Sequence, residues 1–435
     1  MTELGFEELI APTGGEEFFD RYWEREPLLV RRGDPGHYRR LLTLDDLDRL
    51  LAEGGLQHPA LRLVRDGEQV PVRSYTRDLP WGGASFVRAV VVESVLAAHR
   101  DGATVVFQAL HRNHAPLARL CRALESRFAH RFQTNVYLTP PGERGLGVHF
   151  DRHDVFVLQV HGTKRWTVYP AAAERPSRGG SYGFDPADPG EPRFEVTLAA
   201  GDLLYLPRGV PHRAAALDDA SVHVALGVVT TTWADVFARA LDAAGDDPEL
   251  RRSLPAGALL DPARWPGLEE EFHRLVDRFA ARVELPPVLD RLAATFASGR
   301  QPLARGRLAA RDDAGWVELD TLLRRAPTVV AYLRGPWPGG DRAGGGGGDG
   351  AVQLVFQGKR VTLPAAAGPA VARMQAGRPF SVRELPGPID DASRRVVARR
   401  LVREGYLVAA PVGEGTDEAE AGGPAPGEPT AQPPV

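Results

Sequence analysis

The chain has few of the residues that cross-link secreted proteins or anchor proteins in membranes. It contains one cysteine, Cys121, among its 435 residues, which excludes an internal disulfide and a cysteine-based zinc site. No apolar run approaches the roughly 20 residues of a membrane helix. Residues 1–10 carry Glu3, Glu7 and Glu8 and no basic segment, so they do not resemble a signal peptide. These absences predict a soluble cytoplasmic protein that does not associate with membranes.

The chain also lacks a large charge of either sign and has almost no lysine. Its 53 basic and 57 acidic residues give a net charge of −4, which argues against a general polyanion binder. All basic residues are arginines except Lys164 and Lys359. Residues 411–435 contain several acidic residues, no basic residue, and much Gly, Pro and Ala. We expect this acidic tail to be disordered.

What the chain does contain is a pattern of metal-ligating side chains. His149 and Asp151 flank Phe150, and on a β-strand this alternation would place the two ligands on one face. His212 follows a Pro/Gly turn that can direct the chain back toward them. Two imidazoles and one carboxylate on one face of an octahedral ion are typical of Fe(II) sites that bind an organic co-substrate and O2. A bare His-x-Asp pattern is short enough to arise by chance, so the prediction of a metal site also depends on the neighbouring residues.

The neighbouring strands supply groups suited to a carboxylate ligand. Residues 154–160 are typical of a buried strand, and the strand after the next turn places Lys164 and Trp166 on one face. If that face points into a barrel, the ammonium group needs an anionic partner, because an unpaired buried charge is costly. A dicarboxylate co-substrate would provide one. Upstream, Asn135, Tyr137 and Thr139 share a strand face from which they could hydrogen-bond a carboxylate or a peptide.

These motifs resemble the JmjC-type, cupin-fold 2-oxoglutarate oxygenases called ribosomal oxygenases, which hydroxylate arginine or histidine in ribosomal proteins. The similar stretches are residues 19–30, 134–141, 149–169 and 201–212. Together they cover most of the first 230 residues. The implied reaction is oxidative decarboxylation of 2-oxoglutarate to succinate and CO2, coupled to hydroxylation of an unactivated C–H bond.

The resemblance also assigns roles to individual residues. It makes His149, Asp151 and His212 the Fe(II) ligands and catalytic centre. It makes Lys164 the partner of the distal carboxylate of 2-oxoglutarate. Three other positions complete the implied co-substrate site: Asn135 contacts the co-substrate, Tyr137 contacts the co-substrate or the peptide, and Gly227 stands where the family pattern leads us to expect a serine.

The predicted fold class is α+β. We expect a double-stranded β-helix of the cupin or JmjC type, then a helical region that the resemblance makes a dimerisation module, a winged-helix-type C-terminal domain, and the acidic tail. The respective bounds are residues 1–232, 233–305, 306–410 and 411–435. Helices are expected at residues 233–244, 268–279, 287–296, 365–376 and 390–404, and later strands at 317–319, 329–333, 352–356 and 361–363. The chain is therefore expected to form a homodimer.

The last of these helices carries five arginines, but no aromatic stacking residues or strongly positive domain accompany it. A solvated basic helix face is the preferred interpretation, and nucleic-acid binding is not predicted. Residues 344–348, all glycine, are expected to form a flexible loop.

Several alternatives stay open from the residues alone. His153 would share the ligand face on a regular strand and is the main competitor as a third imidazole ligand. The protein could be a metal cupin of the isomerase type, or a catalytically silent cupin that serves as a dimeric binding module. Within the oxygenase interpretation, lysine demethylation or tailoring of a peptide natural product are alternatives to hydroxylation of a ribosomal protein.

Overall fold

The structure is a computed structural model that describes residues 4–53, 55–80, 86–177, 179–180, 182–301, 303, 314–335, 350–410 and 431–432. The chain forms two compact units, Met1–Thr230 with Ala419–Val435, and Thr231–Glu418. Each unit has a hydrophobic core of its own. The predicted glycine loop lies outside the described residues, as does the acidic tail except for Ala431 and Gln432. Among the described residues, no helix is both long and apolar enough to cross a membrane.

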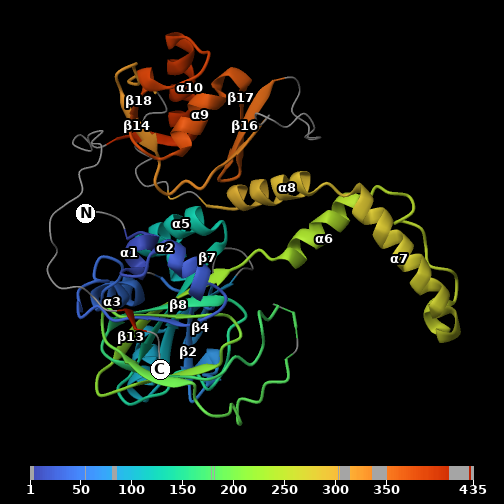
Figure 1. The fold of residues 1–435 in the computed structure, drawn as a ribbon. Helices are drawn as coiled ribbons and strands as arrows, with labels where there is room; N and C mark the ends of the chain where they lie inside the picture. The colour runs from blue at the N-terminus through green and yellow to red at the C-terminus, as the bar shows by residue number, and fades with distance from the viewer. Residues whose placement is uncertain are drawn as a thin grey trace. The chain divides into compact units, whose positions relative to one another are not determined.

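The first unit contains the antiparallel sheets of a double-stranded β-helix (Figure 1). The larger sheet has, in spatial order, β20 (Ala431–Gln432), β1 (Leu28–Val30), β11 (Leu203–Leu206), β8 (Asp154–His161), β13 (Ser221–Val229), β7 (Arg131–Thr139), β6 (Thr104–Phe107), β2 (Leu61–Arg65) and β3 (Glu68–Gln69). The smaller sheet has the order β10 (Phe194–Leu198), β9 (Lys164–Val168) and β12 (His212–Ala216).

The central strand β8 shows why the two sheets pack together. Val155 and Val157 belong to a core shared with Trp166 of β9, between the sheets. Phe156 and Leu158 point to the other face and join a second core. A strand buried on both faces needs a continuous apolar run, which is the pattern that predicted it.

Helices and short strands cover the outer face of the larger sheet or extend it. They are α1 (Phe6–Ile10), α2 (Gly15–Glu17), η1 (Phe18–Tyr22), α3 (Leu44–Glu53), η2 (Val72–Ser74), β4 (Thr76–Pro80), β5 (Phe86–Val90), α4 (Val92–Arg100), η3 (Leu110–Arg112) and α5 (Ala115–Phe128). Aromatic rings of the first segments, such as Phe18, pack on Phe156 of β8 and Tyr205 of β11. Cys121 is a free, buried thiol in α5.

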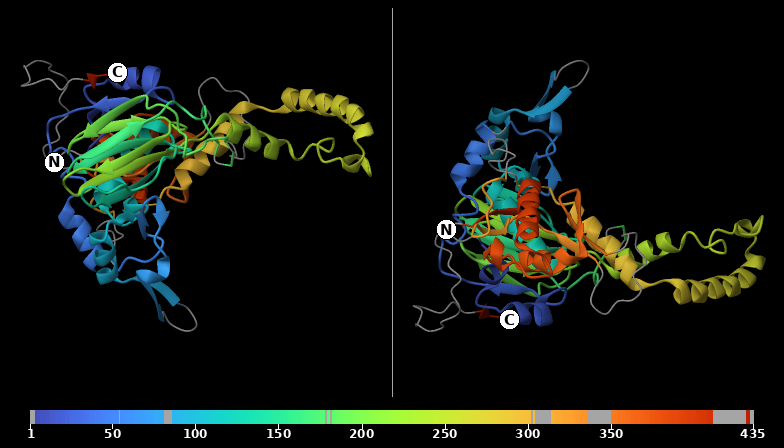
Figure 2. Two further views of the ribbon diagram at one scale, coloured as in Figure 1. Left: turned by 90° about the horizontal axis from the view of Figure 1, so that it is seen from below. Right: turned by 90° about the horizontal axis from the view of Figure 1, so that it is seen from above.

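The second unit begins with the helices that the sequence predicted. They are α6 (Trp233–Ala244), α7 (Trp265–Arg282) and α8 (Leu285–Ser298), with short turns η4 (Ala258–Leu260) and η5 (Pro262–Arg264) before α7. A capping box fixes the start of α6, since the side chains of Thr232 and Asp235 each bond the other's backbone N–H. Within this unit, α7 extends away from the later strands (Figure 2).

The rest of the second unit is a small mixed domain. Its elements are β14 (Leu322–Arg325), β15 (Tyr332–Arg334), β16 (Ala351–Phe356), β17 (Lys359–Pro364), η6 (Ala365–Ala367), α9 (Gly368–Gln375), β18 (Phe380–Ser381), η7 (Val382–Glu384), α10 (Asp391–Glu404) and β19 (Leu407–Ala409). The strand predicted at residues 317–319 is wrong. Val317 is buried, but its amide bonds the carbonyl of Ala314 in a turn, and the strand begins at Leu322. In the sequence, an apolar residue that is buried in a turn gives the same signal as a buried strand residue.

Candidate metal centre

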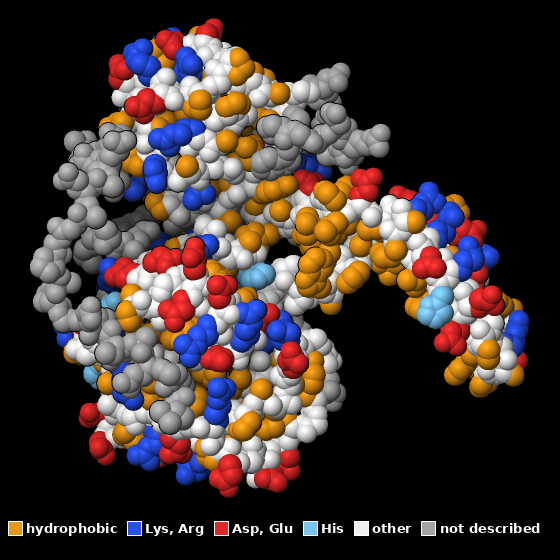
Figure 3. Space-filling view, in the orientation of Figure 1, with side chains coloured by type: hydrophobic (Ala, Val, Ile, Leu, Met, Phe, Trp, Pro, Cys, Tyr) orange, Lys and Arg blue, Asp and Glu red, His pale blue; other side chains and the backbone are white. Residues whose placement is uncertain are grey.

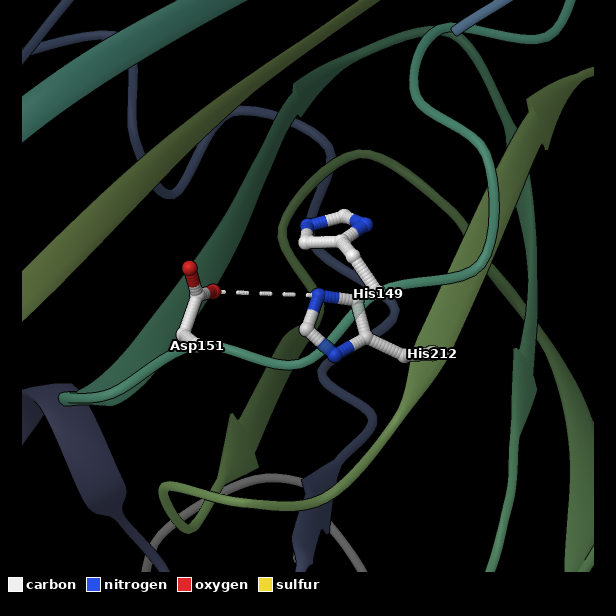
Figure 4. A group of neighbouring side chains, drawn as sticks. All are labelled: His149, Asp151 and His212. Atoms are coloured by element: carbon white, nitrogen blue, oxygen red, sulfur yellow. Dashed lines mark ion pairs between the residues drawn. The ribbon is translucent and has the colours of Figure 1, made fainter. Parts of the chain in front are cut away.

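His149, Asp151 and His212, here called the metal trio, lie together at the opening of the barrel (Figure 4). One potential ligand atom from each residue lies within 4.8 Å of the others. His212 Nε2 is 3.8 Å from Asp151 Oδ2. The structure therefore brings together the three ligands that the sequence pattern predicted.

The backbone positions the trio differently from the sequence expectation. His149 lies in an isolated bridge opposite His212, with two backbone hydrogen bonds: His149 N donates to His212 O (3.1 Å) and His212 N donates to His149 O (2.8 Å). Asp151 lies in the irregular segment before β8. The expectation that His149 and Asp151 share one regular strand is thus wrong, because the bridge at His149 is isolated and the chain is irregular from Phe150 to the start of β8.

A glycine turn locks Asp151 to the chain that leads to His212. The carbonyl of Asp151 accepts a hydrogen bond of 2.9 Å from Gly209 N. Gly209 has a φ of +86°, and a Cβ there would collide with the carbonyl oxygen of Ala173. Only glycine suits this position, so the Pro/Gly turn noted in the sequence brings the last ligand back to the first two.

Both imidazoles are oriented by their own backbone. Nδ1 of His149 lies 2.8 Å from the carbonyl oxygen of Gly147, and Nδ1 of His212 lies 3.0 Å from that of Val210. Because a carbonyl can only accept, each Nδ1 carries the proton and each Nε2 presents its lone pair. Burial, followed by the nearby His149, lowers the pKa of His212 to about 4. His212 is therefore neutral at pH 7, which is the state that binds a metal.

A cavity extends from the trio into the barrel. Its walls include Val155 and Val157 of β8, Ala214 of β12 and Ala225 of β13. The metal trio lines it as well, together with Lys164, Trp166, Tyr137 and His223. The donor set and the open side of the cavity suit an octahedral ion such as Fe(II), which needs free positions for further ligands.

Lys164 is buried inside this cavity without an anionic partner. Its side chain is 2 % exposed, and its Nζ donates a hydrogen bond of 2.8 Å to Thr139 Oγ1 and lies 3.5 Å from His223 Nδ1. No described residue forms an ion pair with it. Burial lowers the pKa of Lys164 to about 7. A buried amine in a metal cavity has the charge and position that suit the carboxylate of a ligand.

Tyr137 lines the same cavity, and its ring stacks on His223 at 4.8 Å between centroids. Burial, and secondarily the charge of Asp151, raise the pKa of Tyr137, so its hydroxyl stays protonated. Asn135 hydrogen-bonds Tyr137, and its Oδ1 accepts a hydrogen bond of 3.0 Å from Ala109 N. Asn135 is not among the residues that line the cavity. The sequence suggested Thr139 as a possible partner of a carboxylate or a peptide, whereas here it accepts the hydrogen bond from Lys164. The sequence assigned no role to Trp166, whose only signal was its place on the strand face of Lys164.

His153 does not join the trio among the described residues. The segment before β8 is irregular, so the alternation that made His153 a competitor does not extend to it. His223 is buried inside the barrel, and burial and the charge of Lys164 hold its pKa well below the usual value.

Comparison with known proteins places this site in a family. The JmjC domain model matches residues 108–236, which include the metal trio. Ribosomal oxygenase 1 of Gallus gallus is 32% identical over 314 residues, 67% of this chain and 50% of that protein. The bifunctional lysine-specific demethylase and histidyl-hydroxylase NO66 of Dictyostelium discoideum is 34% identical over 256 residues, which are 57% of this chain and 48% of that protein. The chain thus spans about half the length of the curated relatives it matches.

Solved structures show the same fold. YcfD, a ribosomal oxygenase from Escherichia coli, aligns with a TM-score of 0.51 and 20% identity over 92% of this chain and 98% of that one. Its complex with cobalt and 2-oxoglutarate aligns with a TM-score of 0.51 and 19% identity over 91% and 98%.

The barrel and the metal trio define a protein with a JmjC domain of the cupin fold. Within that class, the chain resembles ribosomal oxygenases over about half of their length.

Proposed function

We propose that the protein is an Fe(II)- and 2-oxoglutarate-dependent hydroxylase that acts on an arginine or histidine side chain of a ribosomal protein. The observation that carries this proposal is the buried, unpaired Lys164 in the same cavity as His149, Asp151 and His212. A metal site alone would fit an isomerase-type cupin. A cationic anchor across an apolar cavity fits a ligand with two carboxylates.

The chain's own residues would bind and orient the reactants. The Nε2 atoms of the two histidines and the Asp151 carboxylate would hold Fe(II), which supplies the O2 chemistry when it is bound with 2-oxoglutarate. Lys164 would fix the distal carboxylate of 2-oxoglutarate, and the Tyr137 hydroxyl, positioned by Asn135, would contact the co-substrate or the peptide. Val155 and Val157 would keep water from the reacting end.

Two measurements test this proposal. Purified protein given Fe(II), ascorbate and 2-oxoglutarate should form succinate, and His149→Ala should abolish that turnover. Intact masses of ribosomal proteins from cells with and without the gene should differ by one oxygen atom on a single protein. If succinate forms but no ribosomal protein changes mass, the oxygenase assignment holds and the ribosomal substrate is wrong. A difference of methyl groups instead would indicate lysine demethylation.

We infer that the protein is a homodimer that associates through the helices α6, α7 and α8. Their exposed apolar side chains repeat at helical spacing, and Figure 3 shows them gathered along these helices. They include Trp233, Phe237 and Leu241 of α6, Phe272 and Val276 of α7, and Leu285 and Leu289 of α8. Phe237 is 63 % exposed and Leu241 58 %. An apolar stripe of this length on a soluble protein is typical of an interface.

Light scattering after gel filtration tests the dimer. Phe237→Glu with Leu241→Glu should shift the protein to the monomer mass, because charges would be buried in the interface. Arg239→Glu, on the opposite side of α6, is the control and should leave the mass unchanged. A monomeric wild-type protein would contradict the inference.

We further propose that the C-terminal part is a winged-helix-type domain and that the protein is cytoplasmic. The β16–β17 hairpin and the helices α9 and α10 around one core support the first proposal. The arginines of α10 have local partners: Arg395 and Arg399 pair with Glu318, and Arg400 donates to the carbonyl of Thr362. We therefore do not propose a nucleic-acid partner for this helix.

A further inference from the structure

His153 and Gly227 fit together at the inner wall of the barrel. A Cβ built on Gly227 would lie 3.0 Å from Cε1 of His153 and 3.3 Å from both its ring nitrogens. The φ of Gly227 is not positive, so the backbone would accept any residue there. The constraint on this glycine is the imidazole ring, since a side chain at 227 would be in tight contact with it and would push it by a few tenths of an ångström.

Strand pairing places this contact beside residues that line the metal end of the cavity, although neither His153 nor Gly227 lines it. Gly227 pairs in register with Val155, which lines the cavity, and Ala225, two residues earlier on the same face of β13, lines it as well. In the sequence, His153 lies midway between Asp151 of the trio and Val155. Lys164 lies toward the other end of the cavity. On β9, Val168 pairs with His212 of the trio, and Lys164 is four residues away from Val168 along that strand.

The His153 ring also carries an unsatisfied polar atom. Its Nδ1 is buried and has no hydrogen-bond partner among the described residues. A buried polar atom without a partner is unfavourable, because it has lost its hydrogen bonds to water. A ligand atom bound at the metal end would remove that cost.

We propose that Gly227 and His153 form a matched pair, in which Gly227 makes room for the ring and His153 donates a hydrogen bond from Nδ1 to the 2-oxo acid group of the co-substrate at the metal. His153 thereby positions the end of the co-substrate that faces the metal, opposite the end held by Lys164. This inference rests on the proposed function. It also accounts for glycine, rather than the serine expected from the family pattern, at 227: the Cβ of a serine would press on the ring, which would have to give by a few tenths of an ångström.

The first test measures binding of 2-oxoglutarate to the Mn(II)-loaded full chain by calorimetry, without turnover. His153→Phe keeps a ring over Gly227 and removes the donor, and it should weaken 2-oxoglutarate binding about tenfold. His153→Asn keeps a donor near the position of Nδ1 and should stay within about threefold of wild type. Mn(II) affinity and the melting temperature of both variants should match wild type, since His153 is not a metal ligand.

The second test asks whether the two residues act as a pair. Gly227→Ser should weaken 2-oxoglutarate binding by displacing the ring, and His153→Ala should weaken it by removing the donor. The double variant should be much less impaired than the sum of both effects, because the serine then has space and offers its own hydroxyl. Additive effects, or wild-type affinity in His153→Phe, would overturn the inference. If the Mn(II)-loaded wild-type protein binds no 2-oxoglutarate, the proposed function itself fails.

Discussion

At the scale of single residues, His149 and His153 are close in sequence but have different chemical environments. His149 has its Nδ1 held by the carbonyl of Gly147, which frees Nε2 for a metal. His153 has a buried Nδ1 without a partner and packs on Gly227. The difference arises from backbone geometry before β8 and cannot be read from residue types.

Mutation of the two histidines should separate these environments. His149→Ala should weaken Mn(II) binding by more than the roughly 10- to 100-fold that loss of an outer-shell partner costs. His153→Ala should leave Mn(II) binding largely intact. Titration followed by electron paramagnetic resonance measures both. Comparable loss of metal in the two variants would show that the ligand assignment is wrong.

Lys164 should make binding of 2-oxoglutarate depend on pH. Burial brings its pKa to about 7, so the amine loses its charge as pH rises above that value. Because a carboxylate needs the ammonium form, affinity should fall by up to about tenfold per pH unit between pH 7.5 and 9. Calorimetry in buffers of different ionisation enthalpy should show proton uptake on binding.

Lys164→Arg is the matched control, since a guanidinium stays charged over this range. Its affinity for 2-oxoglutarate should not change between pH 7.5 and 9, and Lys164→Met should bind weakly at every pH. An equal pH dependence in wild type and Lys164→Arg would assign the titration to another group.

At the scale of elements, a buried carboxylate joins three segments behind the metal trio. Asp154 is the first residue of β8 and is fully buried. Its Oδ1 accepts a hydrogen bond of 2.8 Å from the hydroxyl of Tyr205 in β11. The Tyr205 hydroxyl oxygen in turn accepts a hydrogen bond of 2.9 Å from the backbone N of Glu24, which follows η1. Arg208 forms an ion pair with Glu24 at 2.6 Å. This network holds β8, the start of the turn toward His212 and the N-terminal segment together.

Asp154→Asn should stabilise the protein at neutral pH. Burial raises the pKa of Asp154 to about 6, so its contribution to stability is present below pH 4 and is lost as pH rises through 6. Asparagine stays neutral and can keep the bond from Tyr205. The free energy of unfolding of the variant minus that of wild type should therefore increase by about 2 to 3 kcal/mol from pH 4 to pH 7. Urea titrations of the apoprotein measure it, and a difference that does not vary with pH would contradict it.

The sequence predicted those elements whose periodicity is local. The helix α6 spans Trp233–Ala244, the range that its apolar residues at helical spacing predicted. The metal trio and Lys164 were predictable because few residue combinations suit that chemistry. The bridge between His149 and His212 was not, because it depends on where distant strands meet. For the same reason, the hydrogen bond from Ala109 that turns Asn135 toward Tyr137 left no trace in the local pattern.

At the scale of the whole molecule, every member of the metal trio and Lys164 belongs to the first unit, which has its own cores. A chain that ends at Thr230 should therefore fold and bind one Mn(II) ion with near wild-type affinity. It should also be monomeric, because it lacks α6, α7 and α8. Circular dichroism, metal titration and light scattering measure these properties. A folded fragment that binds no metal would show that the second unit is needed to complete the site.

The paired backbones of His149 and His212 bear on how the metal would enter and leave. In zinc fingers, the ion itself brings distant ligands together, so much of its binding energy is spent on ordering the chain, and chelators unfold the protein. Here sheet hydrogen bonds already meet the entropic cost of closing the long loop between the two histidines. A chelator should thus strip the ion from a protein that stays folded, and added Fe(II) should restore the site without a refolding step.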